Sequence, residues 1–82
     1  MNERVRHLLE RFPERAELIR ALGESHARFK DLISEHHDVC EEISRMAQGD
    51  RESQAGRMDD LERRRANLEE ELLLLMEDQQ RP

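Results

Sequence analysis

The chain has 82 residues, of which 35% are apolar and 41% are charged, and its net charge is -6. A chain this short forms a single domain, residues 1–82, and buries little core unless it associates or is cross-linked. Because the charge balance is acidic and the longest apolar run, Leu72–Met76, is far shorter than the roughly 20 residues that cross a bilayer, we expect neither nucleic-acid binding nor membrane insertion.

The first part of the chain carries two short apolar stripes separated by a proline. In residues 2–12 the stripe recurs at helical spacing and consists of Val5, Leu8, Leu9 and Phe12. Pro13 interrupts this helix and suits the first turn of another, which we expect to end at Gly23. Its buried edge would be Ala16, Ile19 and Leu22. The pattern predicts a helical segment over residues 2–22 and leaves open whether it is two helices or one kinked helix.

Two longer helices follow, at residues 25–48 and 57–79. Ser25 is a suitable N-cap for the first, and Gly49 is a suitable stop after it. The polar, glycine-flanked stretch 49–56 predicts a loop, although its later residues suit a helix as well.

The apolar residues of the two long helices pair symmetrically about position 52. These pairs, which we call the seam, are Phe29 with Leu75, Leu32 with Leu72, His36 with Leu68, Val39 with Arg65, Ile43 with Leu61, and Met46 with Met58. The symmetry predicts an all-α fold, an antiparallel two-helix hairpin of the coiled-coil kind with one or two short N-terminal helices. His36 and Arg65 are the polar members of the seam. We expect Arg65 to fix the hairpin register if its guanidinium reaches water, Glu42 or Glu69.

One side of the seam is charged and the other is apolar. The apolar flank includes Ile33, Cys40, Leu73 and Met76, whereas Leu74 points away from both the seam and this flank. We expect Leu8, Leu9 and Phe12 to cover part of the flank. Whatever they leave exposed would bind a partner, so the predicted interaction surface is Ile33, Cys40, Leu73, Leu74 and Met76.

His36, His37 and Cys40 are a possible set of metal ligands. His36 and Cys40 lie one helical turn apart, but a zinc centre needs three or four ligands, so a second chain would have to contribute. The simpler interpretation is that His36 packs in the seam and Cys40 on the flank, with no metal or other cofactor.

Two further interpretations have less support. The run Arg63–Arg65 has acidic residues one turn before it, and no aromatic side chain is interleaved to stack on bases. The carboxylates of the helices are expected on solvated faces, where they have no reason for shifted pKa values. We therefore expect no enzyme and weigh nucleic-acid binding as the less favoured alternative.

The single cysteine, Cys40, excludes an intramolecular disulfide, and the first residues, Met1–Arg4, lack the layout of a secretory signal. We therefore expect a cytoplasmic location.

An ordered series of segments runs through nearly the whole chain. It comprises Val5–Glu14 (VRHLLERFPE), Glu17–Arg20 (ELIR), His26–Phe29 (HARF) with Leu32, Glu35–Val39 (EHHDV), Glu42–Arg45 (EISR), and Leu61–Arg65 (LERRR) with Leu68, Glu71 and Leu72. In this series the chain resembles the YdcH-like family of small bacterial cytosolic proteins of unknown function. The resemblance implies a helical hairpin, no assigned activity and no catalytic residues.

The chain departs from the family pattern at two places. It reads Leu68-Glu69-Glu70-Glu71 where the family typically reads Leu-Lys-Asp-Glu, and Ala47 stands where an acidic residue is common. The missing lysine puts in doubt any partner contact that depends on that charge.

Together these patterns predict a non-enzymatic protein–protein interaction or self-association module. Its partner would be a second copy, in a dimer or higher oligomer, or another helical protein. The alternative is a metal-responsive protein with an intermolecular His/Cys site.

Overall fold

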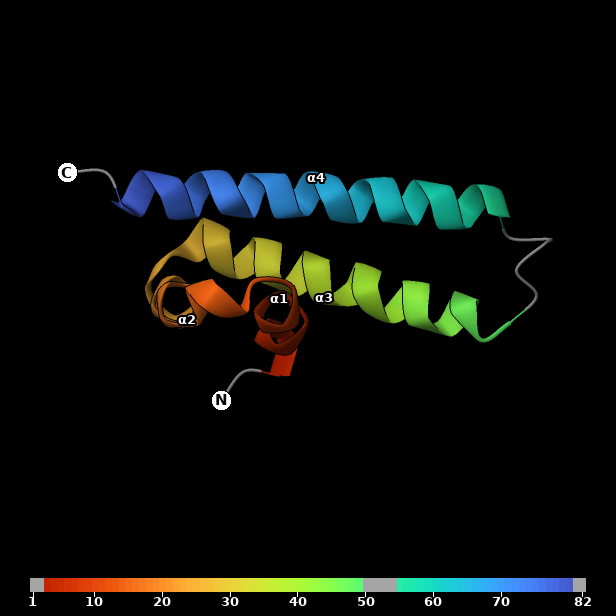
Figure 1. Cartoon of the computed structure of the whole chain (residues 1–82), viewed down its shortest axis with the longest axis horizontal. Helices are drawn as coiled ribbons and strands as arrows, with labels where there is room; N and C mark the ends of the chain where they lie inside the picture. The colour runs from red at the N-terminus through yellow and green to blue at the C-terminus, as the bar shows by residue number, and fades with distance from the viewer. Residues whose placement is uncertain (1–2, 50–54, 81–82) are drawn as a thin grey trace.

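The computed structural model describes residues 3–49 and 55–80, and within them the chain forms helices and no strand (Figure 1). In chain order the elements are the 3-10 turn η1 (Glu3–Val5), α1 (Arg6–Arg11), the 3-10 turn η2 (Pro13–Arg15), α2 (Ala16–Ser25), α3 (Ala27–Ala47) and α4 (Ala55–Gln80). The prediction of an all-α fold is confirmed.

The N-terminal segment is two helices with a break at Phe12. Phe12 has φ -133° and ψ 64°, outside the helical region, because the ring of Pro13 disfavours a helical conformation for the preceding residue. The predicted stop at Gly23 is wrong, since α2 continues to Ser25. A Cβ at Gly23 would lie 3.3 Å from Cδ1 of Ile33, so the glycine allows α2 to lie close against α3.

The N-cap of α3 is His26 and not Ser25. The Nδ1 atom of His26 accepts a hydrogen bond from the backbone N–H of Phe29 at 3.1 Å. Ser25 instead ends α2 and donates its hydroxyl to the Ala21 carbonyl at 2.8 Å. An imidazole nitrogen therefore takes the place of the usual capping hydroxyl or carboxylate.

The long helices α3 and α4 lie side by side and run in opposite directions (Figure 1). α3 ends at Ala47, and the Gly49 N–H donates to the Met46 carbonyl at 3.1 Å. Residues 50–54 of the predicted loop 49–56 lie outside the described residues. The last two, Ala55 and Gly56, already belong to α4, which starts two residues earlier than predicted and extends one residue further.

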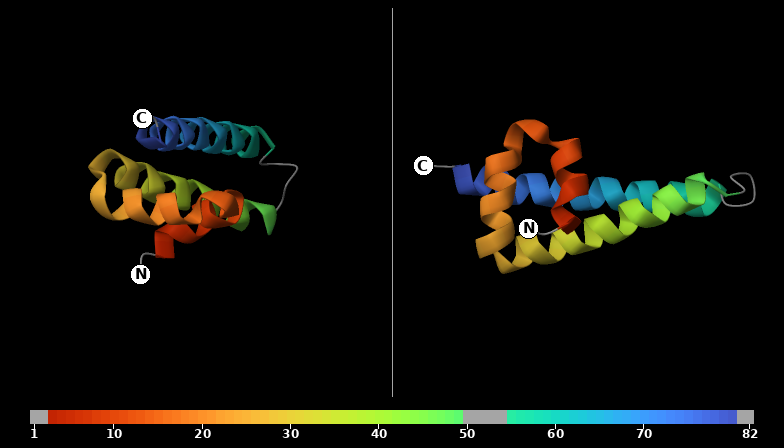
Figure 2. Two further views of the ribbon diagram at one scale, coloured as in Figure 1. Left: turned by 60° about the vertical axis from the view of Figure 1, so that its left-hand side comes forward. Right: turned by 90° about the horizontal axis from the view of Figure 1, so that it is seen from below.

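The two short helices pack on one side of this pair. α1 and α2 both contact α3, and α2 also contacts α4, so the chain's own N-terminus forms a second layer over part of the long helices (Figure 2). The side chains buried most completely are Leu8, Ile19, Phe29, Leu32, Ile33, His36, Leu72 and Met76. The core therefore lies where α1 and α2 cover the α3–α4 pair.

Candidate functional site

A charged hydrogen-bond network lies inside this core. The Glu69 carboxylate of α4 accepts bonds from Arg11 Nε at 2.8 Å and Arg11 Nη2 at 3.1 Å, and a third from His36 Nε2 at 2.8 Å. The His36 side chain is 0% exposed and that of Glu69 10% exposed, whereas that of Arg11 is 48% exposed. One carboxylate thus joins α1, α3 and α4. We call Arg11, His36, Cys40 and Glu69 the Glu69 cluster.

The sequence itself contains a signal for this network. Glu69 interrupts the otherwise apolar flank beside Ile33, and Arg11 lies three residues after the buried Leu8, on the same face of α1. A carboxylate predicted on a covered flank needs a cation. Arg11 on the covering helix is the residue that supplies it.

Burial and hydrogen bonding shift the pKa values in this cluster. Burial lowers the pKa of His36 and outweighs the opposing hydrogen bond to Glu69, so the imidazole is neutral and donates Nε2–H. Burial alone would raise the pKa of Glu69, but the hydrogen bonds from Arg11 and His36 outweigh it, and the net shift is downward. The hydrogen bond to Glu69 likewise raises the pKa of Arg11. Near neutral pH the cluster therefore holds one carboxylate, one guanidinium and one neutral imidazole.

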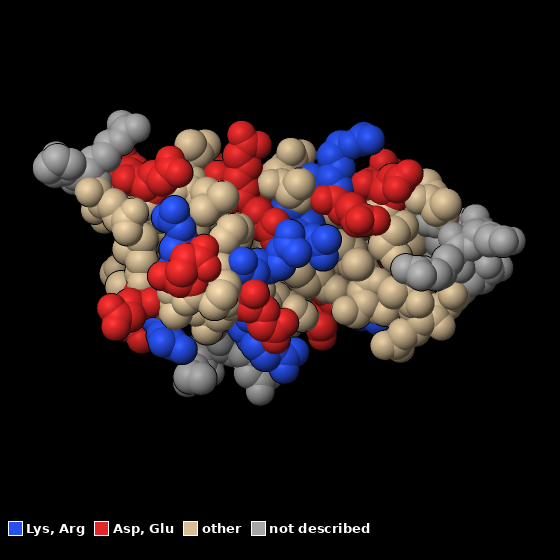
Figure 3. All heavy atoms as spheres, in the orientation of Figure 1, with Lys and Arg blue, Asp and Glu red and all other residues tan. Residues whose placement is uncertain are grey.

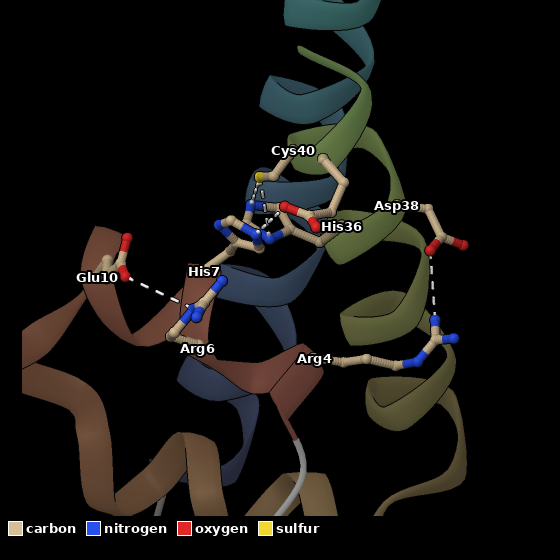
Figure 4. Close-up of polar contacts among 8 residues, drawn as sticks. Arg4, Arg6, His7, Glu10, His36, Asp38 and Cys40 are labelled. Atoms are coloured by element: carbon tan, nitrogen blue, oxygen red, sulfur yellow. Dashed lines mark hydrogen bonds and ion pairs between the residues drawn. The ribbon is translucent and has the colours of Figure 1, made fainter. Parts of the chain in front are cut away.

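Cys40, His36 and Glu69 have the composition of a catalytic triad but not its geometry. The Cys40 Sγ lies 3.8 Å from both His36 ring nitrogens, so it does not lie along the in-plane lone pair of either one (Figure 4). Burial also raises the pKa of the Cys40 thiol. A nucleophilic cysteine needs an aligned base and a lowered pKa, and this thiol has neither.

The predicted metal ligands do not converge. His36 is bonded to Glu69, whereas His37 lies beside His7 of α1, with ring centroids 5.2 Å apart. The His7 Nε2 is 3.1 Å from the Glu41 carboxylate, so this neighbour is also in use. Over residues 3–49 and 55–80, no three His, Cys, Asp or Glu side chains are arranged to hold a metal ion. The pattern His36, His37 and Cys40 does not make a site within one chain.

Arg65 is half-buried in the seam, as its position requires, but its expected carboxylates are otherwise occupied. Glu42 pairs with Arg57, and Glu69 pairs with Arg11. The positive charge of Arg65 instead acts on Cys40 and His36. It lowers the pKa of the Cys40 thiol, which burial raises, and it lowers the pKa of the His36 imidazole, which burial lowers as well. Its role in fixing the register stays a prediction.

The structure corrects the predicted interaction surface. Ile33, Cys40 and Met76 are buried inside the chain, because α1 and α2 cover the flank on which they lie, and Leu73 is half-buried. Leu74 is 58% exposed and is the single large apolar side chain that is exposed in the described part of the chain. Only Leu74 remains fully available to a partner.

Leu74 lies in a shallow groove on the C-terminal half of α4. The groove has a volume of about 400 Å³ and is lined by Glu71, Leu74, Leu75, Glu77 and Asp78. We call it the Leu74 groove. Its floor is the two leucines, of which Leu75 is half-buried, and its rim is formed by the three carboxylates.

A second groove, of about 540 Å³, lies between α3 and α4 and has a mixed-charge lining. Its residues are Glu35, Asp38, Val39, Glu42, Arg57, Asp60, Leu61, Arg63, Arg64 and Asn67. Arg57 pairs with Glu42, and Arg64 lies 4.0 Å from Glu35. Acidic and basic side chains are interspersed over the face shown in Figure 3. Ion pairing within the chain therefore partly neutralises the arginines that a nucleic acid would need.

None of the helices over residues 3–49 and 55–80 has a stretch long and apolar enough to cross a membrane. Comparisons with protein-family models, with curated proteins and with solved structures gave no match to this chain.

Proposed function

We propose that this chain is a non-enzymatic helical protein that pairs with another helical segment, from a second copy or from a different protein, through the Leu74 groove. The observation that carries the proposal is the exposure of Leu74 on a helix whose other large apolar side chains are buried or half-buried. Burying a leucine side chain contributes about 2 kcal/mol, which is enough for one anchor of a helix–helix contact.

The Glu69 cluster supports the non-enzymatic part of the proposal. It holds the groups that catalysis would use, but the carboxylate already accepts three hydrogen bonds, the imidazole has no access to solvent and the thiol is protonated. Its geometry suits a structural role, in which α1 is held against α3 and α4.

Burial of the seam supports the finer architecture that we propose, a coiled-coil-like hairpin in the predicted register. All described seam residues of α3 and α4 are buried or half-buried, including the polar pair His36 and Arg65. The YdcH-like resemblance and a cytoplasmic location belong to the same proposal, and rest on the segment series and on the single free cysteine.

Selection of binding peptides tests the proposal. A displayed library of helical peptides is selected on the chain, and each recovered binder is then measured on Leu74→Gln, a substitution that keeps helix propensity and removes the apolar group. We expect binders that need Leu74. If every binder recovered binds Leu74→Gln equally well, the groove is not a docking surface and the proposal is wrong.

A further inference from the structure

The charges around Leu74 distinguish between a second copy of the chain and a different protein as the partner. Among the groove residues, Glu71 is paired with Arg28 of α3 at 2.8 Å. No described side chain forms an ion pair with Glu77 or Asp78, both of which are exposed. Within residues 3–49 and 55–80, the rim thus keeps two unpaired carboxylates, three and four positions C-terminal to the exposed leucine.

A second copy fits this rim poorly. In an antiparallel contact centred on Leu74, Glu71 would face Glu77 of the other copy and Glu70 would face its Asp78. In a parallel contact each carboxylate would face its own equivalent. Arg28 neutralises Glu71 but not Glu70, Glu77 or Asp78, so each symmetric arrangement still brings unpaired like charges together beside the apolar anchor, which opposes association.

An asymmetric contact between two copies offers Leu74 no fully exposed apolar counterpart among the described residues. Among the described residues the other copy exposes no large apolar side chain besides its own Leu74. The other large apolar side chains of the described residues are buried or half-buried, so each offers Leu74 only part of its apolar surface. A second copy thus provides either a matching Leu74 with repelling charges or apolar side chains that are largely covered.

We propose that the Leu74 groove binds an amphipathic helix of a different protein, with Lys or Arg flanking an apolar stripe. This inference rests on the proposed function and names the partner's chemistry. Along α4 the groove residues are spaced three and four positions apart, at Glu71, Leu74, Leu75 and Asp78. A second helix carries its own side chains at the same spacing, so the two rows can interdigitate. Basic side chains one turn before and after the apolar anchor would reach the carboxylates on both sides of Leu74.

The test uses the same display selection with a defined library. Peptides of about 20 residues carry a fixed apolar stripe, and the positions beside it are randomised equally among Lys, Glu and Gln. Circular dichroism first establishes that every protein variant keeps the helix content of the parent. We expect the selected peptides to be enriched in Lys beside the stripe and to bind about tenfold more weakly to Leu74→Gln.

Charge variants on α4 provide the matched comparison. Glu77→Lys combined with Asp78→Lys should weaken the selected peptides about tenfold, whereas Glu62→Lys, an exposed change of the same kind on the N-terminal half of α4, should leave binding unchanged. Raising the salt from about 50 to about 500 mM should weaken binding to the parent chain and have less effect on the double variant.

The outcomes separate this inference from the proposed function. Binders that need Leu74 but show no preference for Lys, or prefer Glu, overturn the inference and leave the proposed function standing. Sedimentation that shows a dimer of the parent chain, lost in Leu74→Gln, does the same. Recovery of no binder that needs Leu74 overturns both.

Discussion

Glu69→Ala should destabilise the chain far more than removal of an exposed helical carboxylate would. Removal of the carboxylate leaves the His36 Nε2–H, which is 0% exposed, without an acceptor, at a cost of about 1–3 kcal/mol. Loss of the two Arg11 bonds adds about 1 kcal/mol, since Arg11 is half exposed and its pairing is screened by water. The expected decrease in the free energy of unfolding is therefore about 2–4 kcal/mol, measured by urea denaturation followed at 222 nm.

A neighbouring residue provides the control. Glu70→Ala removes an exposed carboxylate from the same turn of α4 and should change stability by less than about 0.5 kcal/mol. Replacement of both Glu69 and His36 by leucine should recover much of the loss, because no buried donor is then left unpaired. If Glu69→Ala and Glu70→Ala unfold at the same urea concentration, the network does not hold α1 against the long helices.

Three further predictions concern residues of the core and the seam. Because burial lowers the pKa of His36, the unfolded chain binds the imidazole proton more tightly than the folded chain does. The free energy of unfolding should therefore fall as the pH drops below about 6.5, and His36→Leu should flatten this dependence. A flat pH profile for the parent chain would argue against a buried, neutral His36. Cys40 should react with a thiol reagent at pH 8 at least about tenfold more slowly in the native chain than in urea, and equal rates would show that the thiol is accessible. Arg65→Leu should change the oligomeric state or the register, as seen by sedimentation and by cross-links between engineered cysteines; if neither changes, Arg65 does not specify the hairpin.

The regular parts of this structure were predictable because helical periodicity is a local property. The spacing of Leu8, Ile19, Phe29 and Leu72 marked the buried faces before any contact was known. Helix ends were less predictable, because they depend on neighbours. α2 continues past Gly23, which lies close against Ile33, and His26 takes the cap that Ser25 was expected to form.

The polar groups were the hardest to place from sequence. Glu69, His36 and Arg11 are separated by tens of positions along the chain, and each alone resembles an ordinary surface or seam residue. Within one chain the three candidate metal ligands do not converge, because His36 and His37 contact different neighbours, Glu69 and His7, and the intermolecular site stays a prediction. Leu74 was recognisable because its helical position points away from both the seam and the apolar flank, and the structure leaves it exposed.

Site-specific photo-crosslinking in the cell of origin tests the central proposal most directly. A benzophenone amino acid at position 74 is compared with the same group at position 62, which is exposed on the same helix outside the groove. The Leu74 groove predicts an adduct at position 74 and not at 62, with the cross-link mapped by mass spectrometry to a basic amphipathic helix of a different protein. No adduct at position 74, or identical adducts at both positions, would contradict it.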